Sequence, residues 1–230
     1  MSDRLSEQAA GIGALAEPVR RALYLFVVAA GDAVSREQAA AGAGVPLHTA
    51  KFHLDRLVDE GLLDVEYRRL SGRSGPGAGR PAKLYRRSEI QLSVSLPERR
   101  YDLAGRVLAA GVERAGREQV DATEAVRRSA HDAGRAIGED HATGVRDVAS
   151  LDRVGAVLSE HGYEPRRRGD DLVLANCPFD ALAAEHTTLV CGMNQALVDG
   201  VLEGLGCEIM AARLDPEDGL CCVKVAPAPG

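Results

Sequence analysis

Residues 49–69, TAKFHLDRLVDEGLLDVEYRR, and residues 79–86, GRPAKLYR, decide the fold of the first part of this chain. The apolar residues first recur at helical spacing, which predicts an amphipathic helix over residues 46–60. Residues 62–67 and 82–85 then have the composition of strands, and a loop rich in glycine and arginine separates them. The buried face of the helix is expected to consist of Leu47, Ala50, Leu54, Leu57 and Val58.

Two further helices are predicted upstream of this segment. Pro18 suits the first turn of a helix over residues 17–30. Ser35 is expected to cap the next helix, which Gly42 and Gly44 interrupt. Three helices followed by a basic hairpin predict a winged helix-turn-helix over residues 1–95.

The net charge of −6 conceals an asymmetry between the two halves of the chain. Residues 1–100 hold 15 Lys and Arg against 12 Asp and Glu, whereas residues 101–230 hold 13 against 22. Polyanion binding is therefore expected in the first half. The absence of Trp and the presence of only three Phe argue against stacking on single-stranded bases. The basic residues between 68 and 87, where no acidic residue occurs, are Arg68, Arg69, Arg73, Arg80, Lys83, Arg86 and Arg87.

In a winged helix, the third helix enters the major groove and the wing lies on the phosphate backbone. Thr49 and Lys51 are candidates for hydrogen bonds to base edges or phosphates, and Phe52 for contact with a thymine methyl group. His53 has two interpretations, a DNA contact or a packing residue. The full set of predicted contacts to double-stranded operator DNA is His48, Thr49, Lys51, Phe52, His53, Arg56, Arg80 and Lys83.

The rest of the chain predicts a helical linker and dimerisation region over residues 96–148 and a small α+β sensor domain over residues 149–230. A helix over residues 98–117 has one apolar face, suited to packing against a second copy in a homodimer. That face consists of Leu103, Val107, Leu108 and Val112. The predicted fold class is therefore α+β.

All cysteines of the chain fall in its last quarter: Cys177, Cys191, Cys207, Cys221 and Cys222. The odd count fits poorly with a fully paired disulfide framework, and no C-x2-C pair of the kind used in zinc ribbons occurs. The wide intervals predict that separate elements deliver the thiols: Cys177 after a strand, Cys191 within a helix and Cys221 at the start of a strand. Thiolates select soft centres such as iron–sulfur clusters or Zn²⁺.

The segment TAKFHLDRLVDEGLLDVEYRR followed by GRPAKLYR resembles the winged-helix repressors of the ArsR type, especially the SufR-like iron–sulfur repressor subgroup. The similarity to that subgroup extends over residues 151–225. It implies that Cys177, Cys191 and Cys221 hold an iron–sulfur cluster, either [4Fe-4S] or [2Fe-2S]. The Cys-x-Cys pair of many metal-sensing ArsR proteins does not occur in the DNA-binding half.

The fourth ligand of such a cluster is open at this stage. His186 lies between two proposed ligands, and Cys222 is adjacent to a third. Since neighbours in a strand point to opposite faces, Cys221 and Cys222 are not expected to face the same site. Cys207 is interpretable as a small buried hydrophobic residue.

We therefore expect a homodimeric transcriptional regulator, a repressor that senses iron–sulfur or redox status, and not an enzyme. No apolar run approaches the length of a membrane span, and the first residues lack the pattern of a secretory signal, so a cytoplasmic location without membrane contact is expected. One alternative is a metal-free thiol switch. Another is a small apolar effector in a pocket of Leu172, Val173, Leu189 and Met193.

Overall fold

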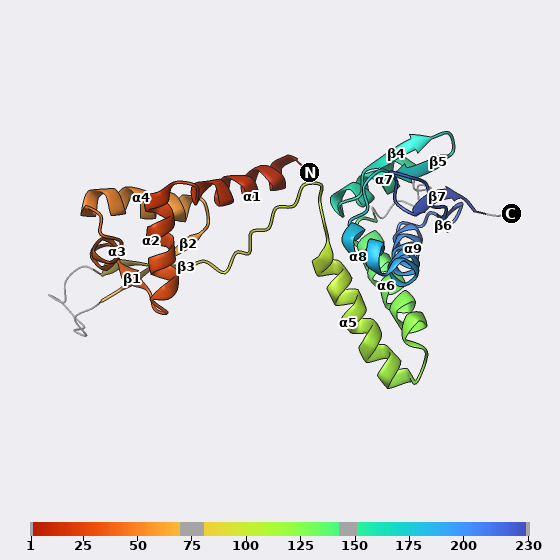
Figure 1. The fold of residues 1–230 in the computed structure, drawn as a ribbon, viewed down its shortest axis with the longest axis horizontal. Helices are drawn as coiled ribbons and strands as arrows, with labels where there is room; N and C mark the ends of the chain where they lie inside the picture. Colours follow the sequence, from red (N-terminus) through yellow and green to blue (C-terminus); the bar gives the residue numbers. More distant parts are fainter. Residues whose placement is uncertain (1, 70–80, 143–150, 229–230) are drawn as a thin grey trace. The chain divides into compact units, whose positions relative to one another are not determined.

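The structure, a computed structural model, describes residues 2–69, 81–142 and 151–228. The chain divides into two compact units, residues 1–94 and 95–230, which are drawn in Figure 1 and described separately here. The predicted DNA contact Arg80 lies outside the described residues. None of the described helices is long and apolar enough to span a membrane.

The first unit contains the three helices and the hairpin that the sequence predicts, together with an additional helix before them. Its elements are α1 (Ser2–Ala14), α2 (Pro18–Ala29), β1 (Val34–Ser35), α3 (Arg36–Ala43), α4 (Leu47–Asp59), β2 (Leu63–Arg68) and β3 (Ala82–Arg87). The strands form an antiparallel sheet in the order β1-β3-β2. Leu23 of α2, Leu54 and Leu57 of α4, Leu63 and Tyr85 belong to the core that joins the helices to the sheet.

Short-range hydrogen bonds fix the helix boundaries of the first unit. Ser35 and Gln38 form a reciprocal capping box at the start of α3, as the expected cap at Ser35 requires. Gly44 ends α3 in a left-handed conformation, with φ 66°. Gly42, however, lies inside α3, so the prediction that it interrupts the helix was wrong. The ring of Phe26 occupies the space that a side chain at position 42 would need.

The prediction that Leu47 belongs to the buried face of α4 was also wrong. Ala50, Leu54 and Leu57 are fully buried, but Leu47 is 45% exposed. Leu47 is the first residue of α4, and the contact with the core begins one turn later, at Ala50.

The second unit combines helices with a four-stranded sheet and thereby gives the chain an α+β composition. Its elements are α5 (Tyr101–Glu118), α6 (Ala122–Asp140), α7 (Leu151–Glu160), β4 (Pro165–Arg168), β5 (Asp171–Leu174), α8 (Asp180–Glu185), α9 (Thr187–Gly204), β6 (Met210–Leu214) and β7 (Val223–Pro227). The strand order is β4-β5-β7-β6, and all neighbours are antiparallel. The described part of residues 96–148, predicted as a separate helical region, belongs to this unit.

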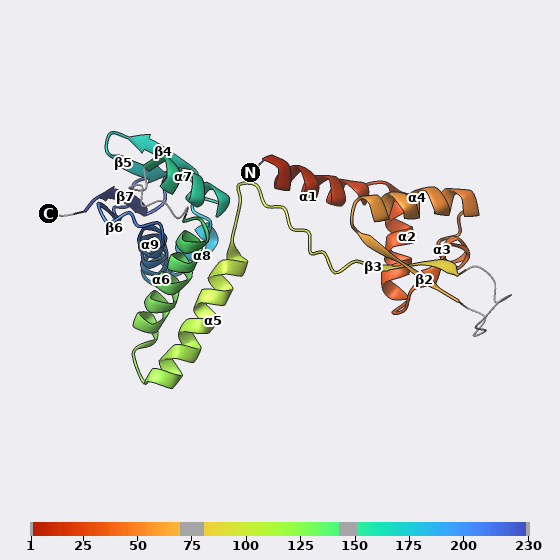
Figure 2. The same cartoon turned by 180° about the vertical axis from the view of Figure 1, so that it is seen from behind.

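Helix α9 joins two hydrophobic clusters of the second unit. Val198 and Val201 pack with the sheet and α7, whereas Met193 and Leu197 pack with α5, α6 and Phe179. Figure 2 shows α5, α6 and α9 beside one another in this unit. Apolar side chains therefore surround most of α9, which explains why it is buried along most of its length.

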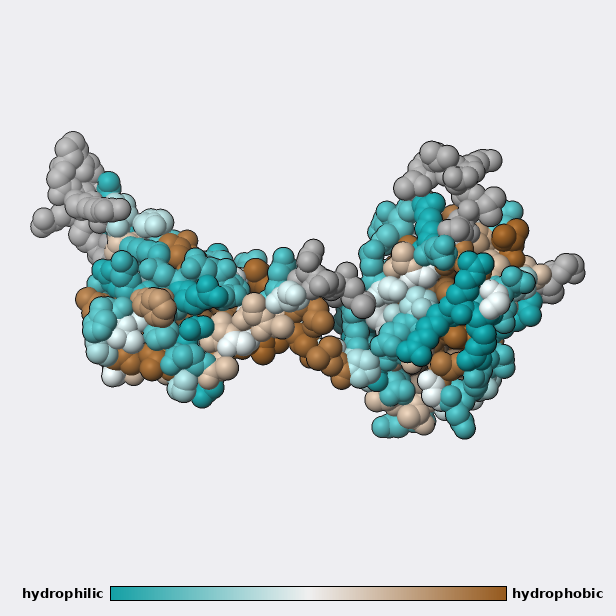
Figure 3. All heavy atoms as spheres, turned by 90° about the horizontal axis from the view of Figure 1, so that it is seen from above, coloured by the Kyte–Doolittle hydropathy of each residue, from teal (hydrophilic) through white to brown (hydrophobic). Residues whose placement is uncertain are grey.

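The apolar face of α5 is largely used within the chain. Leu103 and Val107 are buried in the cluster with α6 and α9, and Leu108 packs against that cluster. Val112, in contrast, is 66% exposed, so it does not share this buried face. Other apolar side chains are exposed on both units, visible as brown spheres in Figure 3. Pairing of two chains through α5 stays a prediction.

Glycines allow α6 and α9 to approach until backbone touches backbone. A methyl group at Gly200 of α9 would overlap the carbonyl oxygen of His131 on α6, and one at Gly134 of α6 would overlap that of Leu197. Gly138 and Gly204 meet in the same way one turn further along. Because the obstructing atoms are backbone, a side chain at these positions forces the helices apart.

We predict that Gly200→Ala lowers the free energy of unfolding of the second unit by about 3 kcal/mol, since the added methyl group overpacks the α6–α9 contact. Gly105→Ala on α5 is the matched control, because Gly105 is exposed and nothing lies near its Cβ position. The control is expected to gain about 0.5–1 kcal/mol from the better helix propensity of Ala. Urea unfolding of the full chain measures both. Similar changes in the free energy of unfolding for the two variants would contradict the close contact between α6 and α9.

Candidate functional site

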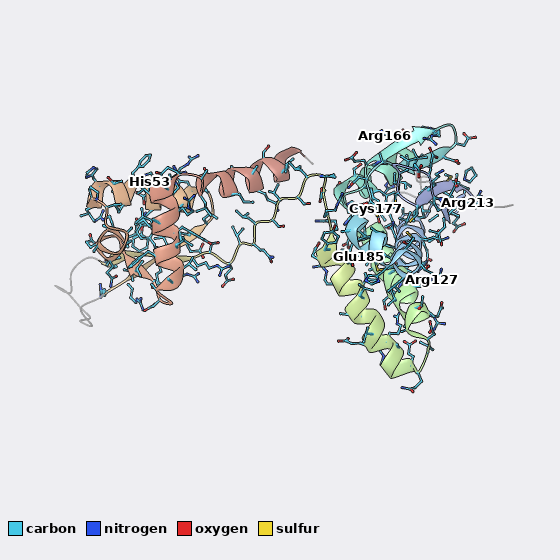
Figure 4. All side chains as sticks on the ribbon, viewed as in Figure 1. His53, Arg127, Arg166, Cys177, Glu185 and Arg213 are labelled. Atoms are coloured by element: carbon cyan, nitrogen blue, oxygen red, sulfur yellow. The ribbon has the colours of Figure 1, made fainter. Side chains whose placement is uncertain are left out.

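Four cysteines of the second unit meet at one place. The side chain of Cys221 interacts with those of Cys177 and Cys222, and the side chain of Cys222 interacts with that of Cys191. We call these four residues the four-thiol site; Figure 4 labels Cys177. The three predicted ligands Cys177, Cys191 and Cys221 are thus brought together, with Cys222 connecting two of them.

The expectation that Cys221 begins a strand and that Cys222 follows it there was wrong, because β7 begins only at Val223 and Cys222 lies in a bend before it. In a bend, adjacent side chains need not point to opposite faces. The sequence signal that indicates this geometry is the turn ending at Gly219, which has a φ of 76°.

The other two candidates do not join the site. His186 is exposed at the junction of α8 and α9, and no interaction of the described residues connects it to a cysteine. Cys207 is 1% exposed and belongs to the cluster around the sheet and α7, in line with the interpretation of a small buried hydrophobic residue.

Backbone contacts hold the segments of Cys177 and Cys221 close together. The Cys221 N–H donates to the carbonyl of Leu174, the last residue of β5, over 2.8 Å. Cys177 follows β5 by three residues and packs against both hydrophobic clusters of the unit. The site therefore lies where the two clusters meet.

Arg99 and Asn176 fix the loop that carries Cys177. The Arg99 guanidinium donates to the side-chain oxygen of Asn176 and, over 3.3 Å, to the carbonyl of Cys177. The Asn176 amide in turn donates to the carbonyls of Glu98 and Gly162. The position of Cys177 thus depends on residues 98 and 99, just before α5. Sequence reasoning missed this connection, because nothing in the local pattern pairs residues so far apart.

The thiols lie in surroundings that disfavour charge when no cation is present. Contact with Cys221 and burial raise the pKa of Cys177 far above its ordinary value. The contact with Cys177 lowers the pKa of Cys221, but Cys222 and burial outweigh it and raise that pKa to about 11. Burial likewise raises the pKa of Cys191. A cation that binds here must displace protons, so its affinity is expected to fall as the pH falls.

The donor set fits a soft centre. Four sulfurs, from the loop after β5, from α9 and from the segment before β7, match the ligands that iron–sulfur clusters take. Within the described ranges, no three His, Cys, Asp or Glu side chains surround a single metal-ion position. The site is therefore not arranged as the closed tetrahedron of a structural zinc ion.

The second chemical surface is the exposed face of α4 in the first unit. His48, Lys51, Phe52 and Arg56 are exposed, and Thr49 is half-buried. Phe52 is large and apolar but 66% exposed, so it does not belong to the core of the first unit. Arg56 forms an ion pair with Glu60 one turn further along the helix.

His53 faces the interior of the unit. Its side chain is 12% exposed, and its Nδ1 lies 3.6 Å from a carboxylate oxygen of Glu17, the N-cap residue of α2. Arg20 donates to the same nitrogen. His53, labelled in Figure 4, therefore connects α4 to the start of α2, which corresponds to the packing interpretation.

Lys83 of the wing is engaged within the unit as well. Its Nζ donates to Asp55 of α4 over 2.6 Å, and the Tyr85 hydroxyl donates to the same oxygen over 3.0 Å. Burial alone would raise the pKa of Asp55, but these two hydrogen bonds outweigh it and lower the pKa. Asp55 thus ties the exposed helix to strand β3. Sequence reasoning assigned Lys83 to the DNA backbone and overlooked Asp55.

Residues 15–66 match a family model described as a helix-turn-helix domain. No curated protein and no solved structure matches the chain significantly. The matched region extends from α2 through α4 into β2, so it includes the exposed face of α4. A helix-turn-helix domain is typical of DNA-binding transcription regulators.

Asp55→Asn is predicted to destabilise the helix-turn-helix domain at neutral pH by no more than about 1 kcal/mol, since the tie to Lys83 is partly exposed. Because folding lowers the pKa of Asp55, its contribution is present above the unfolded pKa of about 3.9 and is lost as the pH falls through the folded value. Unfolding curves of both proteins should therefore converge in acid. A difference that persists at low pH would contradict this assignment.

Proposed function

We propose that this chain is a DNA-binding transcription regulator, acting as a repressor, whose second unit holds an iron–sulfur cluster in the four-thiol site. Two copies would bind a palindromic operator as a homodimer. The single observation that carries the sensing part is that four thiols from three segments of the chain lie at one place. The cluster supplies a redox- and iron-dependent state when bound.

The helix-turn-helix match and the exposed face of α4 support the DNA-binding part. Lys51 and Arg56 offer positive charge, and Phe52 offers an apolar surface for a thymine methyl group. Lys83 reaches a phosphate only by sharing or leaving its contact with Asp55. His53 contributes by holding α4 against α2 rather than by touching bases.

The ligands we propose are Cys177, Cys191 and Cys221, with Cys222 as the fourth instead of His186. Cys222 contacts two of the other thiols, whereas His186 is exposed. Four thiol ligands from one chain form the commonest donor set of an iron–sulfur cluster. In the bound state each thiol gives up its proton to become a ligand.

The Arg99–Asn176 contacts offer a route from this site towards the DNA-binding unit. They connect the loop of Cys177 to residues 98 and 99, which end the segment leading from β3. Residues 88–100 contain no helix or strand and connect β3 to α5. We hypothesise that the cluster-bound form binds the operator and that loss or oxidation of the cluster releases it.

A metal-free thiol switch is the second candidate, and the contact between Cys177 and Cys221 favours it. A disulfide there would form with loss of two electrons and two protons to an added oxidant such as diamide. The apolar effector has less support, because Leu172 and Met193 pack into different clusters.

We predict that anaerobically purified protein contains iron and sulfide and absorbs visible light. Cys177→Ser, Cys191→Ser, Cys221→Ser and Cys222→Ser are each expected to lose most of this absorbance, because each removes a thiolate ligand. His186→Ala is the control and is expected to retain it. Analysis of iron and sulfide together with visible spectra measures the effect.

Three outcomes of that experiment count against the proposal in different ways. Wild-type protein without iron and sulfide would refute the cluster. A diamide-induced disulfide between Cys177 and Cys221 in such iron-free protein would establish the thiol switch in its place. Loss of absorbance in His186→Ala but not in Cys222→Ser would reverse the assignment of the fourth ligand.

Lys51→Ala is predicted to weaken binding to a duplex that the protein selects from a random-sequence pool. If Lys51 contacts a phosphate, the variant should also show a salt dependence smaller by about one unit of slope. Arg106→Ala removes one exposed positive charge from α5 and serves as the control. Titrations at several salt concentrations measure both. Equal effects of the two substitutions would contradict a role of α4 in DNA binding.

A further inference from the structure

We propose that Asn194 and Tyr163 form a buried hydrogen-bonded pair that positions Cys221 and raises the reduction potential of the cluster in the four-thiol site. The inference rests on the proposed function, because it concerns the cluster bound there. Neither residue belongs to the ligand set. Both act on the cluster through the sulfur of Cys221.

The pair forms a chain of two hydrogen bonds that ends on a ligand. The Asn194 side-chain N–H donates to the Cys221 sulfur over 3.2 Å. The Tyr163 hydroxyl donates to the side-chain oxygen of the same asparagine. Asn194 is 1% exposed and Tyr163 2% exposed, so water does not compete for either bond.

The position of Asn194 on α9 follows from helix geometry. It comes three residues after Cys191, and residues three apart lie on the same face of a helix. One face of α9 thus delivers both a ligand and a hydrogen-bond donor to the same site. The close packing of α9 on α6 holds that face in place.

A buried amide aimed at a cysteine suits a charged sulfur better than a neutral one. A thiol sulfur is a weak acceptor, whereas hydrogen bonds to ionised groups are about twice as strong as those between neutral groups. The ligating form of Cys221 is a thiolate with no proton to donate, so only the orientation with the Asn194 N–H towards sulfur satisfies both partners. A hydrogen bond from the buried carboxamide to a neutral thiol would offset less of the free energy that desolvating the carboxamide costs.

The expected effect on the cluster follows from charge. Reduction adds an electron, and the added negative charge spreads onto the ligating sulfurs. An N–H that points at one of these sulfurs stabilises the reduced state more than the oxidised state, which raises the reduction potential. Removing the N–H should therefore make the potential more negative.

The test compares Asn194→Leu with a matched variant on the same helix, Gln195→Leu. The carboxamide of Gln195 donates to the carbonyl of Ala212 and not to sulfur. Gln195→Leu loses one partly buried hydrogen bond of α9 and Asn194→Leu loses two buried ones, so both should lose stability. Only Asn194→Leu is expected to shift the midpoint potential downwards and to lose iron to a chelator about tenfold faster than the wild type.

Tyr163→Phe is the second variant, in case Asn194→Leu does not fold. It keeps the aromatic ring in the core and removes only the hydroxyl that orients Asn194. We expect a downward shift of the midpoint potential in the same direction but of smaller size. Redox titration of the iron-loaded full chain, followed by visible absorbance, measures all three variants.

Different results would overturn the role of Asn194 and the presence of the cluster. Iron-loaded Asn194→Leu and Tyr163→Phe with the potential of the wild type would overturn this inference and leave the cluster in place. A shift of the midpoint potential in Gln195→Leu as large as that in Asn194→Leu would overturn it as well. The shift would then follow from lost stability and not from the hydrogen bond to Cys221. Wild-type protein without iron and sulfide would overturn the proposed function and this inference together.

Discussion

The backbone contact between α6 and α9 is the constraint on which the second unit depends. Gly134, Gly138, Gly200 and Gly204 let the two helices approach so closely that no side chain fits between them at these points. Helix α9 is thereby held between two hydrophobic clusters. Helix α9 carries Cys191 and Asn194. Its packing therefore also determines the positions of a proposed ligand and of the hydrogen-bond donor beside it.

The four-thiol site consists of two buried cysteines and two half-buried ones. Cys191 and Cys221 are buried and fixed by α9 and by the contact with the end of β5. Cys177 and Cys222 are half-buried and lie in loops. The loop of Cys177 is bonded to Arg99 and Asn176. In the proposed regulator, a change in ligation at Cys177 would act through these bonds on the segment that precedes α5.

Local patterns in the sequence predicted α2, α3, α4 and the hairpin, whereas the resemblance to SufR-like repressors implied three thiols of the site. The cap at Ser35 and the apolar spacing in α4 depend on residues within a few positions of one another, so they can be recognised without the fold. The surroundings of Gly42, Lys83 and Cys222 could not be predicted in this way, for the opposite reason. Phe26, Asp55 and the bend before β7 determine their roles, and only the folded chain brings these together.

The central claim is that the state of the four-thiol site controls DNA binding. The most direct measurement is the dissociation constant for one selected duplex, determined anaerobically before and after a chelator removes the iron, with the thiols kept reduced. The account predicts that affinity falls on removal, by about 5- to 150-fold if the coupling is of ordinary size. An unchanged dissociation constant at every salt concentration would contradict it.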